Sequence, residues 1–298
     1  MQIIKTVTEL RSVLKSQASI AFIPTMGNLH AGHIHLVTLA KQHAECVVVS
    51  IFVNPLQFGA NEDLASYPRT LEADCEKLKA AGASIVFTPA VAEIYPQCTD
   101  TESDGINLNQ TMSIAPPPIA NELCGASRLG HFSGVVTVVL KLFNMVFFNG
   151  SHQHVAIFGQ KDFQQLFIIK ELVKQFNLPI TIIAGETVRE ASGLAMSSRN
   201  GYLTTEQRQQ ASQLNSALQG IVSTIKNGNR DFDRLEQFDK LEQQVTSTLK
   251  TQGWLVDYIS IRSALTLSPA TAGDRHLVVL GAAKLGNTRL IDNVEFLR

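Results

Sequence analysis

The sequence predicts an α/β protein in which a parallel sheet carries helices on both faces and precedes a smaller α+β domain. Over the first 185 residues, short apolar runs alternate with helix-length amphipathic patterns, an order that is typical of parallel sheets. After Ala184 the pattern changes, because two long polar helices precede three short strands. We therefore expect two domains, at residues 1–185 and 186–298.

The expected elements of the first domain follow from these runs. Strands are expected at residues 20–23, 46–53, 84–88, 154–158 and 180–184. Helices are expected at residues 33–43, 71–81, 132–148 and 162–176. The apolar run at residues 135–148 is too short to span a bilayer, so we interpret it as part of a buried helix.

The remaining segments have weaker patterns. Residues 96–131 have little periodicity and include three consecutive prolines, so a long loop is expected there. In the second domain, helices are expected at 204–226 and 232–250, and strands at 254–262, 276–283 and 288–292. The pair Gly286-Asn287 is typical of a hairpin turn between the last two strands.

Composition narrows the function class. The chain has 298 residues, of which 45% are hydrophobic and 17% charged, as is typical of a globular enzyme. The formal net charge is −1, so the chain has no overall positive charge that would favour nucleic-acid binding. The chain start lacks a signal-peptide pattern, and the four cysteines lack metal-site spacing, so we expect a cytoplasmic protein without a membrane segment.

The segment from Pro24 to His33 lies between an expected strand and an expected helix, where it predicts a phosphate-binding turn. Helix N-termini offer N–H groups and a partial positive charge to phosphates. Gly27 and Gly32 allow close approach of the backbone, and His30 and His33 share one face of the first turn. The alternative is a helix start with two exposed histidines.

Two further segments suit phosphate chemistry. Met196-Ser197-Ser198-Arg199 combines two hydroxyls with a guanidinium, whose planar fork matches phosphate oxygens. The alternative is a capping and turn cluster before the helix expected at Thr204. Gly159-Gln160-Lys161-Asp162 follows an expected strand. Its lysine can neutralise phosphate charge, and its aspartate suits a ribose hydroxyl or a metal-bound water, or caps the next helix.

A fourth polar segment, residues 54–58, places the neutral amides of Asn54 and Gln57 among apolar residues. Such amides bind the hydroxyl and carboxylate groups of a small polar substrate. Three acidic residues, Glu72, Asp74 and Glu76, follow on the expected helix. They are interpreted as a solvated face, with Asp74 as the candidate for holding Mg²⁺ through a water. Three of the four segments follow strands of one parallel sheet, so they are expected at one sheet edge.

The motifs closely resemble those of the pantothenate synthetases, which join pantoate to β-alanine. The resemblance covers most of the chain and rests on residues 24–33, 50–58, 67–70, 123–132, 159–165 and 193–203. It implies a Rossmann-like nucleotidylyltransferase domain of the HIGH type. Its expected reaction has two steps: pantoate attacks the α-phosphate of Mg·ATP to form a pantoyl adenylate, and β-alanine then displaces AMP.

The resemblance also implies roles for individual residues. Gln57 and Gln165 are expected to bind pantoate, with Gln57 also near β-alanine, and His33 would act as general acid. His30, His33, Lys161 and Arg199 are the expected catalytic residues. ATP is expected to contact Met26, Gly27, Asn28, Leu29, His30, Ala31, Gly32, His33, Gly159, Gln160, Lys161, Asp162, Val188, Met196, Ser197, Ser198 and Arg199. A homodimer and a C-terminal domain that is a lid over ATP are further implications.

Two positions depart from the family pattern, because Ala31 and Ser192 stand where aspartates are usual. Chemically, the cations and imidazoles support electrostatic stabilisation more firmly than proton donation. Two other functions stay open from the sequence: a nucleotidyltransferase that stops at an adenylated product, and a non-catalytic nucleotide-binding module.

Overall fold

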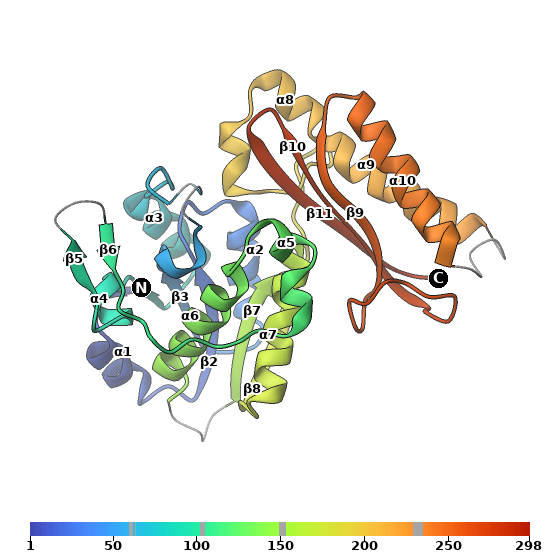
Figure 1. Ribbon diagram of the computed structural model, residues 1–298. Coiled ribbons are helices and arrows are strands. Elements are labelled where there is room, and N and C mark those ends of the chain that lie inside the picture. Colours follow the sequence, from blue (N-terminus) through green and yellow to red (C-terminus); the bar gives the residue numbers. More distant parts are fainter. Residues whose placement is uncertain (60–61, 63, 102–104, 149–152, 229–234) are drawn as a thin grey trace. The chain divides into compact units, whose positions relative to one another are not determined.

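The computed structural model describes the chain except residues 60–61, 63, 102–104, 149–152 and 229–234 (Figure 1). It divides into two compact units. The first comprises residues 1–160 and 165–185, and the second comprises residues 161–164 and 186–298. Residues 161–164, which the sequence placed in the first domain, therefore belong to the second unit.

A six-stranded parallel sheet forms the centre of the first unit (Figure 1). Its strands are β1 (Gln2–Ile4), β2 (Ser19–Thr25), β3 (Cys46–Ile51), β4 (Ile85–Phe87), β7 (Gln153–Gly159) and β8 (Ile180–Gly185). Their order across the sheet is β1-β4-β3-β2-β7-β8, and every neighbouring pair is parallel. The expected α/β fold and its five strands are confirmed. The edge strand β1 was not predicted, because three residues carry no readable periodicity.

Both faces of this sheet are buried, and alternate residues of each strand serve different cores. In β2, Ile20 and Phe22 belong to one core, while Ala21 and Ile23 belong to the other. The first core includes side chains from α1 (Val7–Leu14), α6 (His131–Val146) and α7 (Phe163–Gln175). The second includes side chains from α2 (Ala31–Ala40) and α3 (Leu71–Ala81). This two-sided burial explains why the strands appear as continuous apolar runs.

Helix α6 is the buried helix that the sequence predicted, and eleven of its residues are buried. It packs directly against backbone, because a Cβ at Gly134 would lie 2.3 Å from the carbonyl oxygen of Leu56 and 2.8 Å from the Cα of Gln57. Those two residues belong to the short helix η1 (Pro55–Gln57) after β3. The glycine therefore brings the segment that carries Gln57 against the helix.

The expectation of a long loop at residues 96–131 is wrong in its extent. The segment contains β5 (Thr99–Thr101), β6 (Gly105–Asn107), η2 (Pro118–Asn121) and α5 (Cys124–Ser127). A further helix, α4 (Val91–Ile94), precedes it. Each of these elements spans only three or four residues, which is too few for a hydrophobic period to appear in the sequence.

The second unit packs helices on an antiparallel sheet of order β11-β10-β9. Its elements are η4 (Ser198–Tyr202), α8 (Thr205–Gln210), α9 (Ser212–Asn227), α10 (Leu235–Thr251), β9 (Leu255–Ser263), β10 (His276–Leu285) and β11 (Thr288–Leu297). The predicted hairpin turn is confirmed, since Leu285 pairs with Thr288 across Gly286-Asn287. The first predicted helix is two helices, α8 and α9, and residues 232–234 of the second lie outside the described residues. Among the described residues, no helix is both long and apolar enough to cross a bilayer.

Replacing Gly134 with alanine tests the close approach of α6 to η1. We expect Gly134→Ala to lower the free energy of unfolding by about 1–3 kcal/mol, because the added methyl would overpack a backbone contact. Urea denaturation measures the change. The matched control is Gly220→Ala in α9, where a Cβ meets nothing within 4 Å and where we expect a gain of about 1 kcal/mol from helix propensity. Equal effects of the two substitutions would contradict the packing argument.

A partly buried carboxyl in the second unit predicts a pH dependence of stability. Glu242 on α10 accepts a hydrogen bond from the backbone N–H of Ile261 on β9. Burial raises the pKa of Glu242, with a smaller contribution from Asp239, against the lowering effects of the Ile261 bond and Arg262. A raised folded-state pKa means that stability is lost as pH rises from the ordinary glutamate pKa through the raised value. Unfolding of the wild type and of Glu242→Gln across this pH range should show a smaller loss for the variant.

Candidate active site

The turn between β2 and α2 has a strained backbone and a capped helix start. Gly27 has φ +87° and Asn28 has φ +51°, both in the left-handed region. His30 is the N-cap of α2, and its Nδ1 accepts from the N–H of Gly32 at 3.1 Å. In return, Nδ1 of His33 accepts from the N–H of His30 at 3.3 Å. Two imidazoles therefore perform the reciprocal capping that Ser and Glu more often supply.

This capping determines the tautomers of both histidines. Because each Nδ1 accepts a hydrogen bond, each neutral ring carries its proton on Nε2. The two rings lie 4.0 Å apart between centroids. The turn thus places two imidazole N–H groups at a helix N-terminus, where an anion is already favoured. The expected pairing of His30 with His33 on one turn agrees with this geometry.

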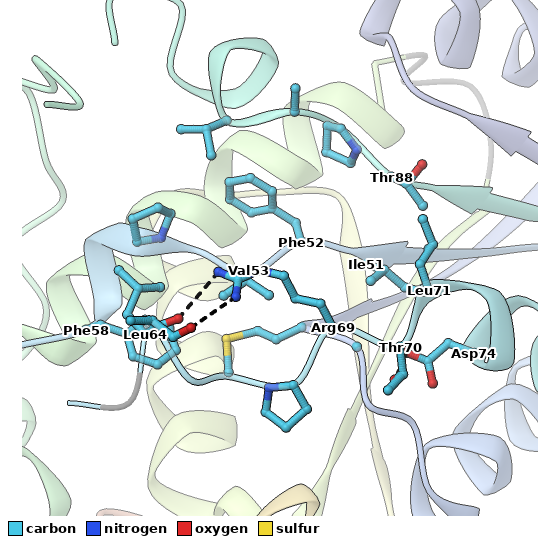
Figure 2. Close-up of a pocket in the computed structure, with 18 of the residues that line it drawn as sticks. Ile51, Phe52, Val53, Phe58, Leu64, Arg69, Thr70, Leu71, Asp74 and Thr88 are labelled. Atoms are coloured by element: carbon cyan, nitrogen blue, oxygen red, sulfur yellow. Dashed lines mark hydrogen bonds between the residues drawn. The ribbon is translucent and has the colours of Figure 1, made fainter. Parts of the chain in front are cut away.

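Asp74 anchors the turn to the neighbouring helix α3. Its side chain is fully buried, so the interpretation of this residue as part of a solvated face is wrong. One carboxylate oxygen accepts from the N–H of Asn28 at 2.7 Å and the hydroxyl of Thr70 at 3.0 Å, and the other accepts from the N–H of Leu29 at 2.8 Å. Figure 2 shows Asp74 and Thr70 side by side. Lys77 donates to the carbonyl of Leu29.

Gln57 is buried and its amide is oriented by its neighbours. The Nδ2 group of Asn54 donates to Oε1 of Gln57 at 3.1 Å and to the carbonyl of Gly134 at 3.2 Å. The Nε2 group of Gln57 contacts the sulfur of Met26 at 3.0 Å. Gln57 is thereby joined to the turn after β2, as expected for two segments at the ends of adjacent parallel strands.

A second chain of contacts holds the backbone of Gln57. Nδ1 of His131 lies 2.9 Å from the Gln57 carbonyl, and Nε2 of His131 lies 2.9 Å from Nη1 of Arg128. Because arginine only donates, Nε2 accepts and Nδ1 carries the ring proton. Arg128 makes a bidentate ion pair with Glu62 at 2.6 Å. Burial opposes ionisation of Glu62, but the hydrogen bonds and charge of Arg128 outweigh it and hold the Glu62 pKa below its usual range.

A cavity of about 980 Å³ opens beside the turn, at the ends of β3 and β4 (Figure 2). Met26 and Gly27 line it, as do Phe52 and Thr88. At its rim, the guanidinium of Arg69 donates to backbone carbonyls of the preceding loop at 3.4 Å. The cavity is mostly apolar with few polar groups, the usual character of a small-molecule site.

In the second unit, the segment from Val188 to Asn200 is a folded hairpin rather than an open loop. Met196 N–H donates to the carbonyl of Val188 at 3.0 Å, and Gly193 turns the chain with φ +92°. Ser197 caps η4 by accepting from the N–H of Arg199 at 3.2 Å. Ser197 therefore caps a short helix, as the capping alternative for this segment predicted. This contact does not test the prediction that residues 196–199 bind phosphate.

Strand β11 anchors both cationic segments of the second unit. Arg189 makes a bidentate ion pair with the buried Asp292, at 2.7 and 2.9 Å. The next residue, Asn293, donates from Nδ2 to the carbonyl of Lys161 at 2.8 Å. The Lys161 ammonium lies 3.7 Å from the carboxylate of Asp162. Two consecutive residues of β11 thus position Lys161 and the hairpin that carries Arg199.

The structure places the predicted site residues in two groups. The first unit contains the turn from Met26 to His33, Gln57, Gly159, Gln160 and Gln165. The second contains Lys161, Asp162, Val188 and the segment 196–199. Gln165 lies in the first turn of α7, which follows β7, the neighbour of β2. The sequence assigned no role to Tyr95, His131 or Asp292. Tyr95 and Asp292 are buried by partners that are distant in the sequence, so no local pattern marks them. His131 lies in the motif at residues 123–132, which carries part of the family resemblance.

Replacing Asp74 with asparagine tests the anchor. An asparagine has one acceptor oxygen, so one buried N–H of the turn would lose its partner, at a cost of about 1–3 kcal/mol. We expect Asp74→Asn to lower the free energy of unfolding and to weaken ATP binding about tenfold, as measured by calorimetry. Glu76→Gln, an exposed residue of the same helix, is the matched control. Equal ATP affinities of the two variants would contradict the anchoring role.

Comparison with known proteins gives consistent matches over the whole chain. A family model described as pantoate–β-alanine ligase matches residues 2–295. The pantothenate synthetase of Methylobacillus flagellatus is 61% identical over 99% of each chain, and that of Thiobacillus denitrificans is 52% identical over 99% of this chain and 97% of its own.

Solved structures agree. Pantothenate synthetase from Thermus thermophilus matches with a TM-score of 0.86 and 35% identity over 99% of each chain. The Francisella tularensis pantoate–β-alanine ligase, solved with β,γ-ATP and β-alanine, matches with a TM-score of 0.71 and 35% identity. That match covers 100% of this chain and 97% of the other.

Proposed function

Because the chain belongs to the pantoate–β-alanine ligase family, we propose that it joins pantoate to β-alanine with ATP through a pantoyl adenylate. In the first step, a carboxylate oxygen of pantoate attacks the α-phosphorus of ATP and the bond to pyrophosphate breaks. In the second, the amine of β-alanine attacks the acyl carbon, the bond to AMP breaks, and the amine loses a proton. The products are pantothenate, AMP and pyrophosphate.

The observation that carries the proposal is the turn capped by His30 and His33. Both rings are tautomers with Nε2–H groups, which donate hydrogen bonds to phosphate oxygens without transferring a proton. Charge on these oxygens grows as pyrophosphate leaves, so fixed donors stabilise the transition state. The role of His33 as a general acid stays a prediction from the resemblance. A proton on its Nδ1 would break the bond from the His30 N–H.

Lys161 and Arg199 are proposed to neutralise the remaining phosphate charge. Arg199 follows the N-cap of η4, and the carbonyl of Lys161 is held by Asn293. Magnesium is proposed to enter with ATP as part of the substrate. Among the described residues, no group of three or more His, Cys, Asp and Glu side chains could hold a metal ion. Asp74 is poorly suited to hold it, since both carboxylate oxygens already accept protein hydrogen bonds.

Gln57 and Gln165 are proposed to bind pantoate, and Gln57 also to lie near β-alanine. The Oε1 atom of Gln57 is occupied by Asn54, so its NH2 group is the part suited to a ligand oxygen. A neutral amide donor binds a carboxylate without forming an ion pair that would oppose its attack on phosphorus. A homodimer, a cytoplasmic location and a C-terminal lid over ATP stay predictions.

A coupled assay for AMP tests the function. We expect AMP to form only when pantoate and β-alanine are both present. Pantoate-dependent exchange of pyrophosphate into ATP without β-alanine would support the adenylate. An adenylated product that β-alanine does not discharge would favour the nucleotidyltransferase alternative. ATP binding without turnover would favour the binding module, and AMP release that needs neither substrate would refute the ligase.

Removing the ammonium of Lys161 tests its electrostatic role. We expect Lys161→Ala to slow pantoate-dependent pyrophosphate exchange about 10²–10³-fold, as for other lost donors of transition-state charge, with a smaller change in the KM for pantoate. Lys170→Ala, an exposed lysine on α7, is the matched control and should retain the full rate. A Lys161→Ala variant that exchanges pyrophosphate at the control rate would rule out the role.

A further inference from the structure

We propose that Tyr95 is a positioning residue for pantoate, because its hydroxyl acts through Asn54 to hold the Gln57 amide with its NH2 group toward the substrate. The inference rests on the proposed function. Tyr95 follows α4 and is fully buried. It therefore acts without touching substrate itself.

The first step is the contact between Tyr95 and Asn54. The tyrosine hydroxyl donates to Oδ1 of Asn54 at 2.6 Å, the shortest hydrogen bond that Asn54 makes. Burial raises the pKa of Tyr95 well above its ordinary value, so the hydroxyl keeps its proton and stays a donor. Asn54 is also buried, where a good hydrogen bond strongly restricts an amide.

The second step is the direction of the Asn54 amide. Its Oδ1 also accepts from the N–H of Leu56 at 3.3 Å, and its Nδ2 faces the carbonyl of Gly134 at 3.2 Å. An N–H only donates and a carbonyl only accepts, so a flipped amide would meet like groups on both sides. Tyr95 provides the shortest of these bonds. The amide therefore has one orientation, with Nδ2 toward Gln57.

The third step is the orientation of the Gln57 amide, which follows from that of Asn54. Since Nδ2 of Asn54 donates to Oε1 of Gln57, the NH2 group of Gln57 must point the other way, where it contacts the sulfur of Met26. A thioether is a weak acceptor, and an NH2 group has a second hydrogen for a ligand. The chain of contacts thus presents a donor, and not an acceptor, to the pantoate oxygens.

The tyrosine ring has its own packing, which allows the hydroxyl to be tested alone. The ring lies 6.3 Å from that of Phe52 between centroids, and the ammonium of Lys141 lies 5.1 Å from its centroid. Lys141 also donates to the carbonyl of Ile94 at 3.0 Å. Tyr95→Phe keeps the ring contacts and removes only the bond to Asn54. A residue that served packing alone would tolerate this change.

The experiment measures KM values in pantoate-dependent pyrophosphate exchange. We expect Tyr95→Phe to raise the KM for pantoate about tenfold, with the KM for ATP and the exchange rate at saturation changed less than twofold. Gln57→Ala should raise the KM for pantoate further, and Tyr95→Phe in the Gln57→Ala background should add nothing, because the two residues act in one chain. Tyr258→Phe on β9, which also loses one hydroxyl, is the matched control.

A second variant, Asn54→Asp, is designed to reverse the orientation of the Gln57 amide, whereas Tyr95→Phe only weakens its support. In Asn54→Asp, a carboxylate would accept from both Tyr95 and the NH2 group of Gln57, so Oε1 of Gln57 would turn toward pantoate. We expect a higher KM for pantoate at neutral pH that falls toward the wild-type value as acidification protonates the new carboxyl. The KM for ATP should not follow this pH profile.

Several outcomes would overturn the proposal. They are an unchanged KM for pantoate in Tyr95→Phe, equal increases for pantoate and ATP, additive effects of Tyr95→Phe and Gln57→Ala, or no pH-dependent recovery in Asn54→Asp. A wild-type protein without pantoate-dependent exchange would overturn the proposed function and this inference together. Exchange in the wild type with no effect of the variants would overturn the inference alone.

Discussion

The hydrogen bonds of the Asp74 carboxylate are the interaction on which the turn between β2 and α2 depends. It accepts from two backbone N–H groups and a hydroxyl, so this fully buried side chain joins the turn after β2 to helix α3. Left-handed backbone in a residue with a side chain, as at Asn28 with φ +51°, persists where surrounding contacts determine it. Since His30 and His33 follow this backbone directly, the direction of their imidazoles depends on a side chain more than forty residues away.

In each unit, the other segments that are proposed to bind ligands are anchored in the same way. Gln57 is held from behind by α6, through the close approach at Gly134 and the contact of His131 with its carbonyl. In the second unit, Asp292 and Asn293 hold Arg189 and Lys161 from a strand of the sheet. The turn after β2, the short helix η1 and the hairpin of the second unit are irregular segments, and polar contacts anchor each of them to a regular element. A site of this kind is preorganised, which is what electrostatic catalysis requires.

Local pattern was enough to predict five of the six strands of the parallel sheet, the helices α2, α3, α6 and α7, and the common edge of the segments after β2 and β3. It succeeded because burial on both faces makes each strand a continuous apolar run. It was not enough for Asp74, which lies between the exposed Glu72 and Glu76 and shares their acidic spacing. Two of its three hydrogen-bond donors, the N–H groups of Asn28 and Leu29, come from the distant turn. Tyr95 likewise has no local signature, since its partner is Asn54. The residues that are proposed to contact ligand lie in sequence motifs, whereas those that position them depend on tertiary contacts.

The dependence of the site on positioning contacts bears on the roles that are proposed for His30 and His33. A general acid at His33 would need an acidic proton, yet its Nδ1 accepts from the N–H of His30, and a neutral ring has one N–H proton, on Nε2. Protonating Nδ1 would open the helix cap that orients both rings. A neutral imidazole held in one tautomer stabilises phosphate charge at no cost in reorganisation. Departure of pyrophosphate needs charge stabilisation more than it needs a proton, and the capping geometry of His30 and His33 is suited to that requirement.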